Sequence, residues 1–338
     1  MKWARISVLL VVATMLVAGC SFYEYPDKMP AVDTPARDEI PEFSYTTKIQ
    51  DMKIVVNDED KGDTWNCKLV KFRIKDFPEL KNKYAKAYHY APKDQSRKYP
   101  CLILYPPTGG PNSFIKKFAA KFADEGYTVM AFQRRERFFD NKKPLEYNAN
   151  LFRQTVIDVR RGIDFLETKP YADTSRVGIM GISLGGVISL LATEADPRIR
   201  STVTVVAAGD MPEILATSGF NRIRKLRKTL TKKYDLDREK LVALAEKELS
   251  PIDPITYADR IDPQRLLMIN ASMDDIVKIH VALNSWEAFG KPDFLRLPTG
   301  HYSTFVFVRS LVKRADEHFL KTLRLEKGKD GRVMAKNK

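Results

Sequence analysis

The stretch that decides the fold reads Arg176-Val177-Gly178-Ile179-Met180-Gly181-Ile182-Ser183-Leu184-Gly185-Gly186-Val187-Ile188-Ser189-Leu190-Leu191-Ala192. Residues 177–180 form a short apolar run that predicts a buried strand, and residues 187–192 are typical of a buried helix. Between them lies a Gly-x-Ser-x-Gly motif. In this strand-turn-helix setting, the motif predicts a sharp turn that strains the backbone of Ser183 and lifts its hydroxyl above the sheet. Ser183 is therefore a candidate nucleophile.

Three glycines suit this turn. Gly181 and Gly185 stand two positions before and after Ser183, where we expect the backbone to crowd so closely that a side chain would clash. Gly186 would let the start of the helix pack closely. The helix N-terminus adds positive potential where an oxyanion would develop, so the backbone N–H of Leu184 is a candidate oxyanion-hole donor.

The pattern around the motif alternates between strands and helices. Short apolar runs at 101–105, 127–132, 202–207 and 266–270 are typical of parallel strands covered on both faces. Helical periodicity lies between them, as at Leu151, Val156, Val159, Ile163 and Leu166. Residues 65–74 and 84–90 alternate as half-buried antiparallel strands do. These features predict a doubly wound, mostly parallel α/β domain over residues 45–326, interrupted by a helical cap at about 211–263.

A serine in such a turn predicts an acid and then a histidine further along the chain, each just beyond a later strand. Asp274 and Asp275 follow the strand at 266–270, and Asp210, beyond the preceding strand, is a more distant candidate. His301 follows a last short strand at 294–297. The other histidines are expected in structural positions: His89 on a strand face, His280 at the start of a helix and His318 on the polar side of a C-terminal helix.

Residues 84–323 resemble the α/β-hydrolase family, closest to its dienelactone hydrolase and prolyl oligopeptidase-like branches. The resemblance rests on the Ser183 motif, on Asp-x-x-Val at 274–277, on Gly-His at 300–301, and on residues 158–161 and 173–176. It implies that Ser183 attacks an acyl carbonyl and that His301 transfers the proton. It also implies that Asp274, three residues before the valine, orients His301, with Asp275 as the nearest alternative.

The resemblance also implies a second oxyanion-hole donor in the loop at 106–110. This loop reads Pro-Pro-Thr-Gly-Gly, where the family usually shows His-Gly followed by glycines. Thr108 or Gly109 could donate, because the chemistry requires a backbone amide and no particular side chain.

The N-terminus predicts export and lipidation. Lys2 and Arg5 precede an uncharged run at 6–18, which suits a signal peptide over residues 1–19 better than a membrane span. The alternative is a plain uncleaved anchor, whose uncharged stretch would have to continue as far as Tyr23. The run ends in Val17-Ala18-Gly19-Cys20, which resembles the lipobox of bacterial lipoproteins. The resemblance implies an acylated Cys20 in the cell envelope, on the periplasmic face of the outer membrane if the cell is Gram-negative. Residues 20–44, which hold four prolines, are predicted to form a tether.

The composition is that of a large globular domain. The chain has 338 residues, of which 44% are hydrophobic, and a formal charge of +14, so collagen-like and mostly disordered chains are excluded. Four histidines and three cysteines leave little room for a Cys/His metal cluster, and we expect neither a metal nor an organic cofactor. Cys67 and Cys101 either pair after export or are two buried small side chains.

The predicted cap contains a strongly basic helix. Residues 221–233 hold seven basic side chains and no acid, and Ile223, Leu226 and Leu230 recur along one face. This helix is either a cap helix with a solvated charged face, or a contact for an anionic membrane or an acidic substrate; nucleic acid is not expected as a partner. A second helix is predicted over 238–249, with Asp237 as its N-cap. The basic tail at 327–338 is predicted to be a frayed terminus.

The favoured function is therefore a membrane-anchored serine hydrolase that cleaves carboxylic esters through an acyl-enzyme. A serine peptidase acting on short peptides uses the same three residues and is the nearest alternative. A non-catalytic lipoprotein that binds an anionic envelope polymer is the alternative from a different class of protein. The sequence predicts neither the substrate nor the oligomeric state.

Overall fold

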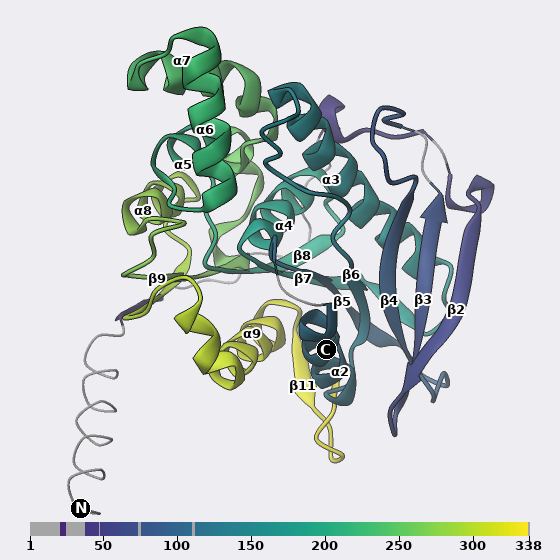
Figure 1. Cartoon of the computed structure of the whole chain (residues 1–338). Helices are drawn as coiled ribbons and strands as arrows, with labels where there is room; N and C mark the ends of the chain where they lie inside the picture. The colour runs from purple at the N-terminus through teal and green to yellow at the C-terminus, as the bar shows by residue number, and fades with distance from the viewer. Residues whose placement is uncertain (1–20, 25–37, 47, 74–75, 110–111, 337–338) are drawn as a thin grey trace, which may run out of the picture.

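The computed structural model describes residues 21–24, 38–46, 48–73, 76–109 and 112–336, which are built around one large sheet (Figure 1). Its ten strands follow the order β1-β10-β9-β8-β7-β5-β6-β4-β3-β2. Their bounds are β1 (Ser21–Tyr23), β2 (Ile54–Lys61), β3 (Trp65–Arg73), β4 (Tyr84–Pro92), β5 (Tyr99–Tyr105), β6 (Thr128–Phe132), β7 (Ala172–Ile182), β8 (Ile199–Val205), β9 (Leu266–Ala271) and β10 (Asp293–Leu297).

The centre of the sheet is parallel and its margins are antiparallel. Strands β10, β9, β8, β7, β5 and β6 pair in parallel, whereas β4, β3 and β2 continue the sheet antiparallel at one side and β1 at the other. All residues of β5, β6 and β9 are buried, as expected for strands covered on both faces. The predicted mostly parallel α/β fold is confirmed.

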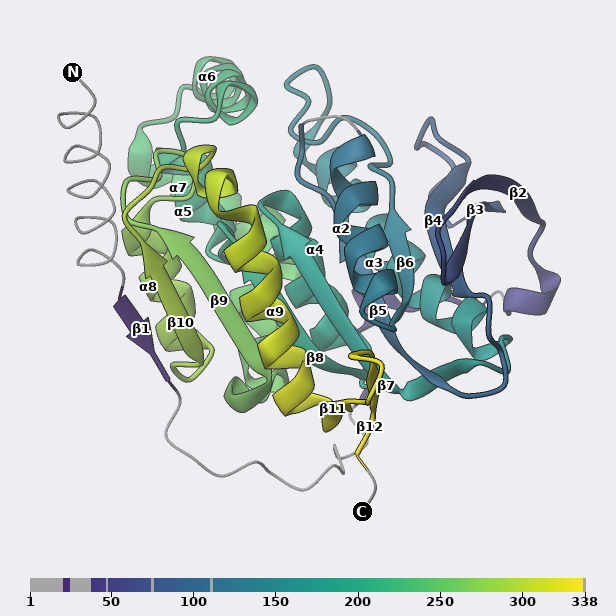
Figure 2. The ribbon, with the colours of Figure 1, turned by 90° about the horizontal axis from the view of Figure 1, so that it is seen from below.

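Helices cover both faces of this sheet (Figure 2). On one face, α2 (Asn112–Asp124) and α9 (Val308–Thr322) supply core residues such as Phe118 and Leu311. On the other face, α3 (Leu145–Glu167), α4 (Leu184–Ala195) and α8 (Ile279–Ala288) contribute a second cluster that includes Val156 and Ile188. The sheet thus separates two apolar layers.

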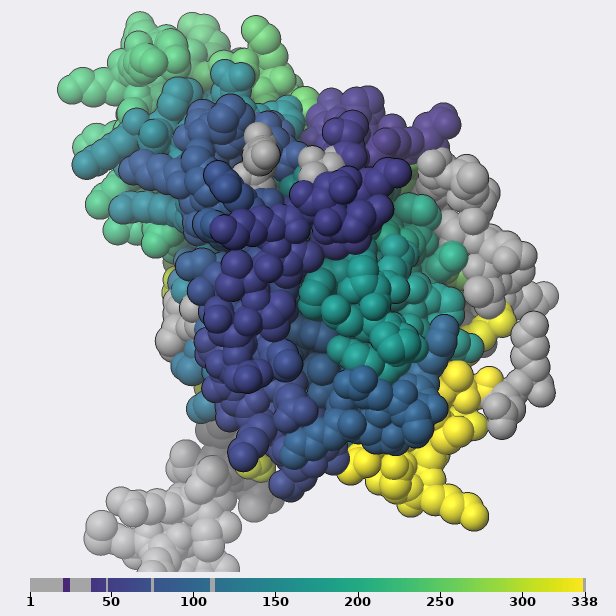
Figure 3. Space-filling view, turned by 90° about the vertical axis from the view of Figure 1, so that its right-hand side faces the viewer, coloured from purple at the N-terminus to yellow at the C-terminus, as the bar shows by residue number. Residues whose placement is uncertain are grey.

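The predicted helical cap lies between β8 and β9. It contains α5 (Met211–Thr217), α6 (Asn221–Tyr234) and α7 (Arg238–Leu249), followed by the 3-10 helices η3 (Ser250–Ile252), η4 (Pro254–Arg260) and η5 (Pro263–Arg265). The predicted apolar face of α6 is buried, and the side chain of Asp237 accepts the N–H of Lys240 at 2.8 Å as the N-cap of α7. In the space-filling view, the green cap projects beyond the body of the molecule (Figure 3).

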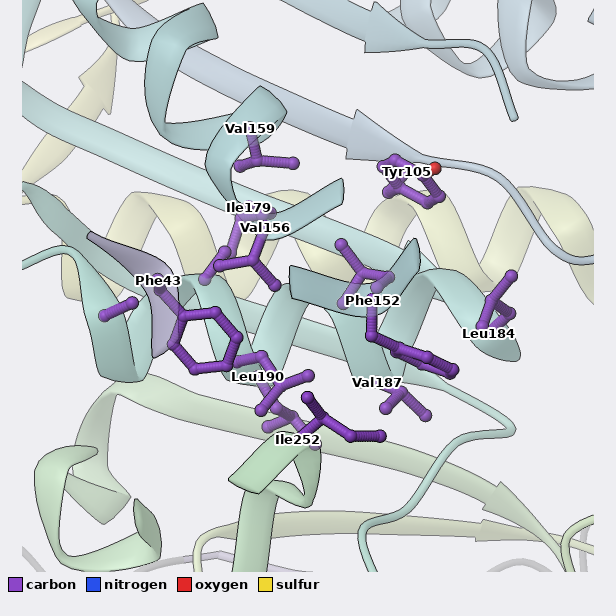
Figure 4. Close-up of a cluster of buried hydrophobic side chains, with 14 of the residues drawn as sticks. Phe43, Tyr105, Phe152, Val156, Val159, Ile179, Leu184, Val187, Leu190 and Ile252 are labelled. Carbon is purple, nitrogen blue, oxygen red and sulfur yellow. The ribbon is translucent and has the colours of Figure 1, made fainter. Parts of the chain in front are cut away.

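The tether predicted at residues 20–44 is wrong at both of its described ends. Residues 21–23 form β1, which pairs with β10, and the 3-10 helix η1 (Pro41–Phe43) packs against the domain. The side chains of Ile40 and Phe43 are 3% and 0% exposed, and Phe43 lies among Val156, Leu190 and Ile252 (Figure 4). Burial of these two apolar side chains stabilises residues 40–43 in the core, and the guanidinium of Arg160 donates to the carbonyl of Phe43 at 2.5 Å. Residues 1–20 and 25–37, including Cys20, lie outside the described ranges.

Two predictions near the C-terminus are also wrong. The tail at 327–338 is not frayed throughout, because β11 (Leu325–Lys327) and β12 (Val333–Ala335) pair antiparallel and bury Val333. His318 is buried rather than solvated, since it extends the stripe of α9 that begins with Leu311 and Ala315. Its Nδ1 lies 3.8 Å from a carboxylate oxygen of Asp293.

Of the two alternatives for Cys67 and Cys101, a disulfide or two buried side chains, the structure shows the second. Cys67 and Cys101 are both free and buried, and they belong to the two different apolar clusters. Burial raises the pKa of the Cys67 thiol to about 11, so this sulfur stays protonated and unreactive.

Within the described ranges, no helix is both long enough and apolar enough to span a membrane.

Candidate active site

The turn between β7 and α4 holds Ser183 in a strained conformation. Its backbone angles are φ 54° and ψ −120°, and its N–H donates to the carbonyl of Val205 at 2.8 Å. A Cβ atom on Gly181 would lie 1.9 Å from the carbonyl oxygen of Gly185. A Cβ on Gly185 would lie 2.2 Å from the carbonyl oxygen of Tyr105, and one on Gly186 would lie 2.3 Å from Ala207 Cβ. Only glycine fits at these three positions.

The structure brings Ser183, His301 and Asp274 together. His301 Nε2 lies 3.0 Å from Ser183 Oγ, and His301 Nδ1 lies 2.7 Å from Asp274 Oδ2. The other carboxylate oxygen of Asp274 accepts the backbone N–H groups of Ile276 and Val277 at 2.8 and 2.9 Å. An ionised carboxylate only accepts hydrogen bonds, so Nδ1 of His301 donates to it, and in the neutral ring Nε2 is then the acceptor for the Ser183 hydroxyl.

The alternative acids lie elsewhere. Asp275 is exposed, and its backbone carbonyl accepts the N–H of Gly219 at 2.7 Å. Asp210 caps α5, where its side chain accepts the N–H of Glu213 at 3.3 Å. Of the other histidines, His89 lies buried on β4, and His280, the second residue of α8, lies 3.4 Å from a carboxylate oxygen of Glu213. The described histidines other than His301 are thus outside this cluster.

The predicted oxyanion-hole residues adjoin Ser183. Leu184 is the first residue of α4, and Thr108 and Gly109 line the same cavity as Ser183. The guanidinium of Arg134, which the sequence did not single out, donates to the carbonyls of Pro107 at 3.3 Å and Gly109 at 3.1 Å. Because a trans peptide directs its N–H away from its C=O, the N–H of Thr108 points away from Arg134.

A cavity of about 510 Å³ lies over Ser183 and His301. The cap roofs it with Met211, Ile214, Phe220 and Ile223. Further lining residues that sequence reasoning missed come from α2, from the loop before α3 and from the segment after His301: Ser113, Phe114, Lys117, Phe139, Tyr302 and Phe305. These residues carry no local motif, since only the fold brings them together. No three His, Cys, Asp or Glu residues of the described ranges gather as metal ligands would.

The fold and this arrangement define the class of protein: the chain has the α/β-hydrolase fold. Acetyl xylan esterase 1 from Thermoanaerobacterium sp. JW/SL YS485 has a TM-score of 0.59 with 20% identity, over 78% of this chain and 88% of that one. The acylaminoacyl peptidase of Pyrococcus horikoshii has a TM-score of 0.56 with 17% identity, over 78% of this chain and 42% of the peptidase. At these identities, the likeness concerns the fold alone.

The family is narrower than the fold. Residues 85–221 match the Dienelactone hydrolase family, so the resemblance found in the sequence is confirmed over this region. The uncharacterized protein YcjY of Escherichia coli (strain K12) is 30% identical over 121 residues, which cover 35% of this chain and 39% of YcjY. Dipeptidyl-peptidase 5 of Porphyromonas gingivalis is 27% identical over 118 residues, which cover 32% of this chain and 17% of the peptidase. The matched part thus spans less than half of each of these relatives.

Proposed function

We propose that the protein is a serine hydrolase that cleaves carboxylic esters through an acyl-enzyme. One observation carries this proposal: Asp274, His301 and Ser183 form a continuous line of hydrogen bonds of 2.7 and 3.0 Å at the floor of an apolar cavity. A strained serine costs about 1–3 kcal/mol, which a purely binding protein has no reason to maintain. This argues against the non-catalytic alternative.

The chemistry follows from the geometry. The Ser183 hydroxyl attacks the ester carbonyl while His301 Nε2 accepts its proton, and Asp274 stabilises the resulting imidazolium. The backbone N–H of Leu184 and that of Thr108 or Gly109 stabilise the negative charge on the carbonyl oxygen. His301 then returns the proton to the alcohol that leaves, and water releases the acid from Ser183 by the same steps in reverse order.

The apolar cavity favours an acyl chain over a peptide. Four of the lining residues are apolar side chains of the cap, and among the described lining residues only Lys117 and His301 are basic and none is acidic. A serine peptidase acting on short peptides is the second candidate, because the similar proteins include a dipeptidyl-peptidase. We further propose that the protein is anchored in the bacterial cell envelope by acylation of Cys20.

A fluorophosphonate probe tests the proposed nucleophile without knowledge of the substrate. We expect the full chain to be labelled, Ser183→Ala to lose the label, and Ser310→Ala, on the exposed side of α9, to keep it. Esters of increasing acyl length and short peptides then decide between esterase and peptidase. A folded full chain that reacts with neither the probe nor any ester would overturn the proposal.

The proposed anchor has its own test. We expect bacteria that express the full chain to attach a clickable fatty acid to it, and we expect Cys20→Ser to abolish this attachment. Cys67→Ser is the matched control, because that thiol is buried and protonated. Equal incorporation of the fatty acid into all three proteins would contradict acylation at Cys20.

A further inference from the structure

Large apolar side chains are exposed beside the cavity opening. Met273, Tyr302 and Val306 are 66%, 68% and 80% exposed. Tyr302 lines the cavity, and Val306 lies one turn further along in the 3-10 helix η6 (Ser303–Phe307). Met273 adjoins this segment, since its N–H donates to the carbonyl of Thr299 at 2.9 Å. We call Met273, Tyr302 and Val306 the apolar rim.

Positive charge lies on the cap helix that closes the same cavity. Ile223 of α6 lines the cavity, whereas the outer side of the helix exposes five basic side chains: Arg224, Lys225, Lys228, Lys232 and Lys233. None of these five forms an ion pair with a carboxylate of the described residues. Lys117 of α2 is exposed at the cavity itself, and Arg309 is exposed three residues after Val306. The opening therefore has an apolar rim with Lys117 and Arg309 beside it, and the cap over the cavity carries a basic outer side.

The N-terminal strand enters the sheet at this same edge. β1 is antiparallel to β10, with Ser21 opposite Arg296 and Tyr23 opposite Phe294 (Figure 2). The chain leaves β10 at Leu297 toward His301, so Ser21 lies at the end of β10 that leads to the active site. Phe22 and Tyr23 are 47% and 37% exposed. Cys20, the proposed lipidation residue, directly precedes Ser21.

We infer that this edge docks on an anionic phospholipid membrane, with the cavity opening directed at the bilayer. Exposed apolar side chains enter the interface between headgroups and acyl chains, and basic side chains contact the phosphates. A second copy of this chain fits less well, because two such faces would bring their lysines together. An acidic polymer also fits less well, because it would pair with the basic side chains but leave the apolar rim exposed to water. The inference extends the proposed function, because an ester from the bilayer would then reach Ser183 without crossing water.

Fluorescence quenching by nitroxide-labelled lipid tests the orientation on the full chain. Bimane is attached to Met273→Cys or Val306→Cys, and to Gln95→Cys, an exposed control just before the amino end of β5. The unsubstituted chain measures the background from Cys20, because the other two cysteines, Cys67 and Cys101, are buried. In vesicles of phosphatidylcholine with phosphatidylglycerol, we expect at least threefold more quenching at 273 and 306 than at 95. Equal quenching at the three positions would overturn the orientation.

A charge-reversal pair tests the basic helix. Lys225→Glu with Lys228→Glu should lower quenching at position 306 at least threefold in the anionic vesicles. Lys48→Glu with Lys53→Glu, two exposed lysines before β2, makes the same change in net charge and should leave it unaltered. Equal losses in both pairs would mean that net charge alone attracts the protein, which would contradict a basic face on α6.

Two controls separate the possible failures. Concentration-dependent self-quenching at position 306 without vesicles would show a second copy on this face and overturn membrane docking. Fluorophosphonate labelling of the same variants reports on Ser183 independently, since none of the substituted residues lines the cavity. Loss of labelling with an intact quenching pattern would therefore contradict the proposed serine hydrolase function but not the proposed membrane docking.

Discussion

The strained backbone of Ser183 is held by its neighbours. A positive φ in a residue other than glycine costs free energy, and the surrounding contacts must supply it. Here the neighbours are backbone atoms: a Cβ on Gly181 would meet the carbonyl of Gly185, and a Cβ on Gly185 would meet the carbonyl of Tyr105. Rigid neighbours of this kind cannot move aside for a methyl group.

Gly181→Ala and Gly109→Ala should therefore behave differently. The new Cβ at 181 would lie 1.9 Å from a carbonyl oxygen, so we expect loss of fluorophosphonate labelling and destabilisation by about 1–3 kcal/mol or more. The Cβ at 109 meets nothing within 4 Å, and alanine keeps the backbone N–H, so labelling should persist. Labelling kinetics and urea unfolding measure both effects. Full activity in Gly181→Ala would contradict the crowded turn.

The two adjacent aspartates offer a second matched pair. Asp274→Asn should lower kcat by about 10³–10⁴-fold, because an amide stabilises the wrong tautomer of His301. Asp275→Asn should stay within a few-fold of the unsubstituted protein, since its side chain is exposed. Turnover of an activated ester by both variants gives the comparison. Loss of turnover in Asp275→Asn but not in Asp274→Asn would mean that Asp275 orients His301.

Sequence reasoning could propose Ser183 and His301 because a glycine-framed turn and chain order are local features. It could separate Asp274 from Asp275 only through the family resemblance, whereas the structure separates them by burial. The cavity walls could not be found in this way, because Phe114 on α2 and Phe305 on η6 meet only in the folded chain.

Among the elements, the central strands were the most predictable. Their continuous apolar runs reflect burial on both faces, as in β5. β2 was missed because six of its eight residues are exposed and four of those, at 57–60, are Asn, Asp or Glu, which are uncommon in strands. β1 was missed because three residues carry no period, and its pairing with β10 depends on a partner more than 250 residues away.

Phe43→Ala tests whether η1 belongs to the folded domain. Removing a fully buried phenylalanine should cost about 3–5 kcal/mol, measured as a lower urea midpoint of the full chain. Thr46→Ala, an exposed position nearby, should change stability by no more than about 0.5 kcal/mol. If the Phe43→Ala variant were as stable as the unsubstituted chain, η1 would not contribute to the folded domain, and the prediction of a tether would hold for this segment.

At the scale of the whole molecule, covering both faces of the sheet buries ionisable groups as well as apolar ones. His89 lies on β4 beneath the rings of Phe165 and Tyr171, with Nε2 3.4 Å from the hydroxyl of Thr128. Burial, together with the positive charges of Lys169 and Lys68, lowers the pKa of His89 to about 3. Burial raises the pKa of Asp158 to about 6, which has the opposite effect on the pH dependence of stability.

His89 should therefore make the fold sensitive to acid. The unfolded chain binds a proton at this histidine below about pH 6.5 and the native chain does not, so stability present at pH 7 is lost as the pH falls toward 3. Between pH 7 and pH 5 this single group should account for about 2 kcal/mol. The contribution of Asp158 to the stability of the fold falls as the pH rises, which is the opposite trend. Only a comparison of variants therefore isolates the contribution of His89.

That comparison is between the unsubstituted chain and His89→Gln, which keeps a side-chain donor for Thr128 but cannot titrate. Urea unfolding at pH 7, 6 and 5 gives the free energy of unfolding for each protein, and referring both to pH 7 removes the cost of the substitution itself. The glutamine variant should lose about 2 kcal/mol less than the unsubstituted chain on acidification to pH 5. Parallel curves would mean that His89 is protonated in the native state, and that the covered sheet does not exclude charge at this position.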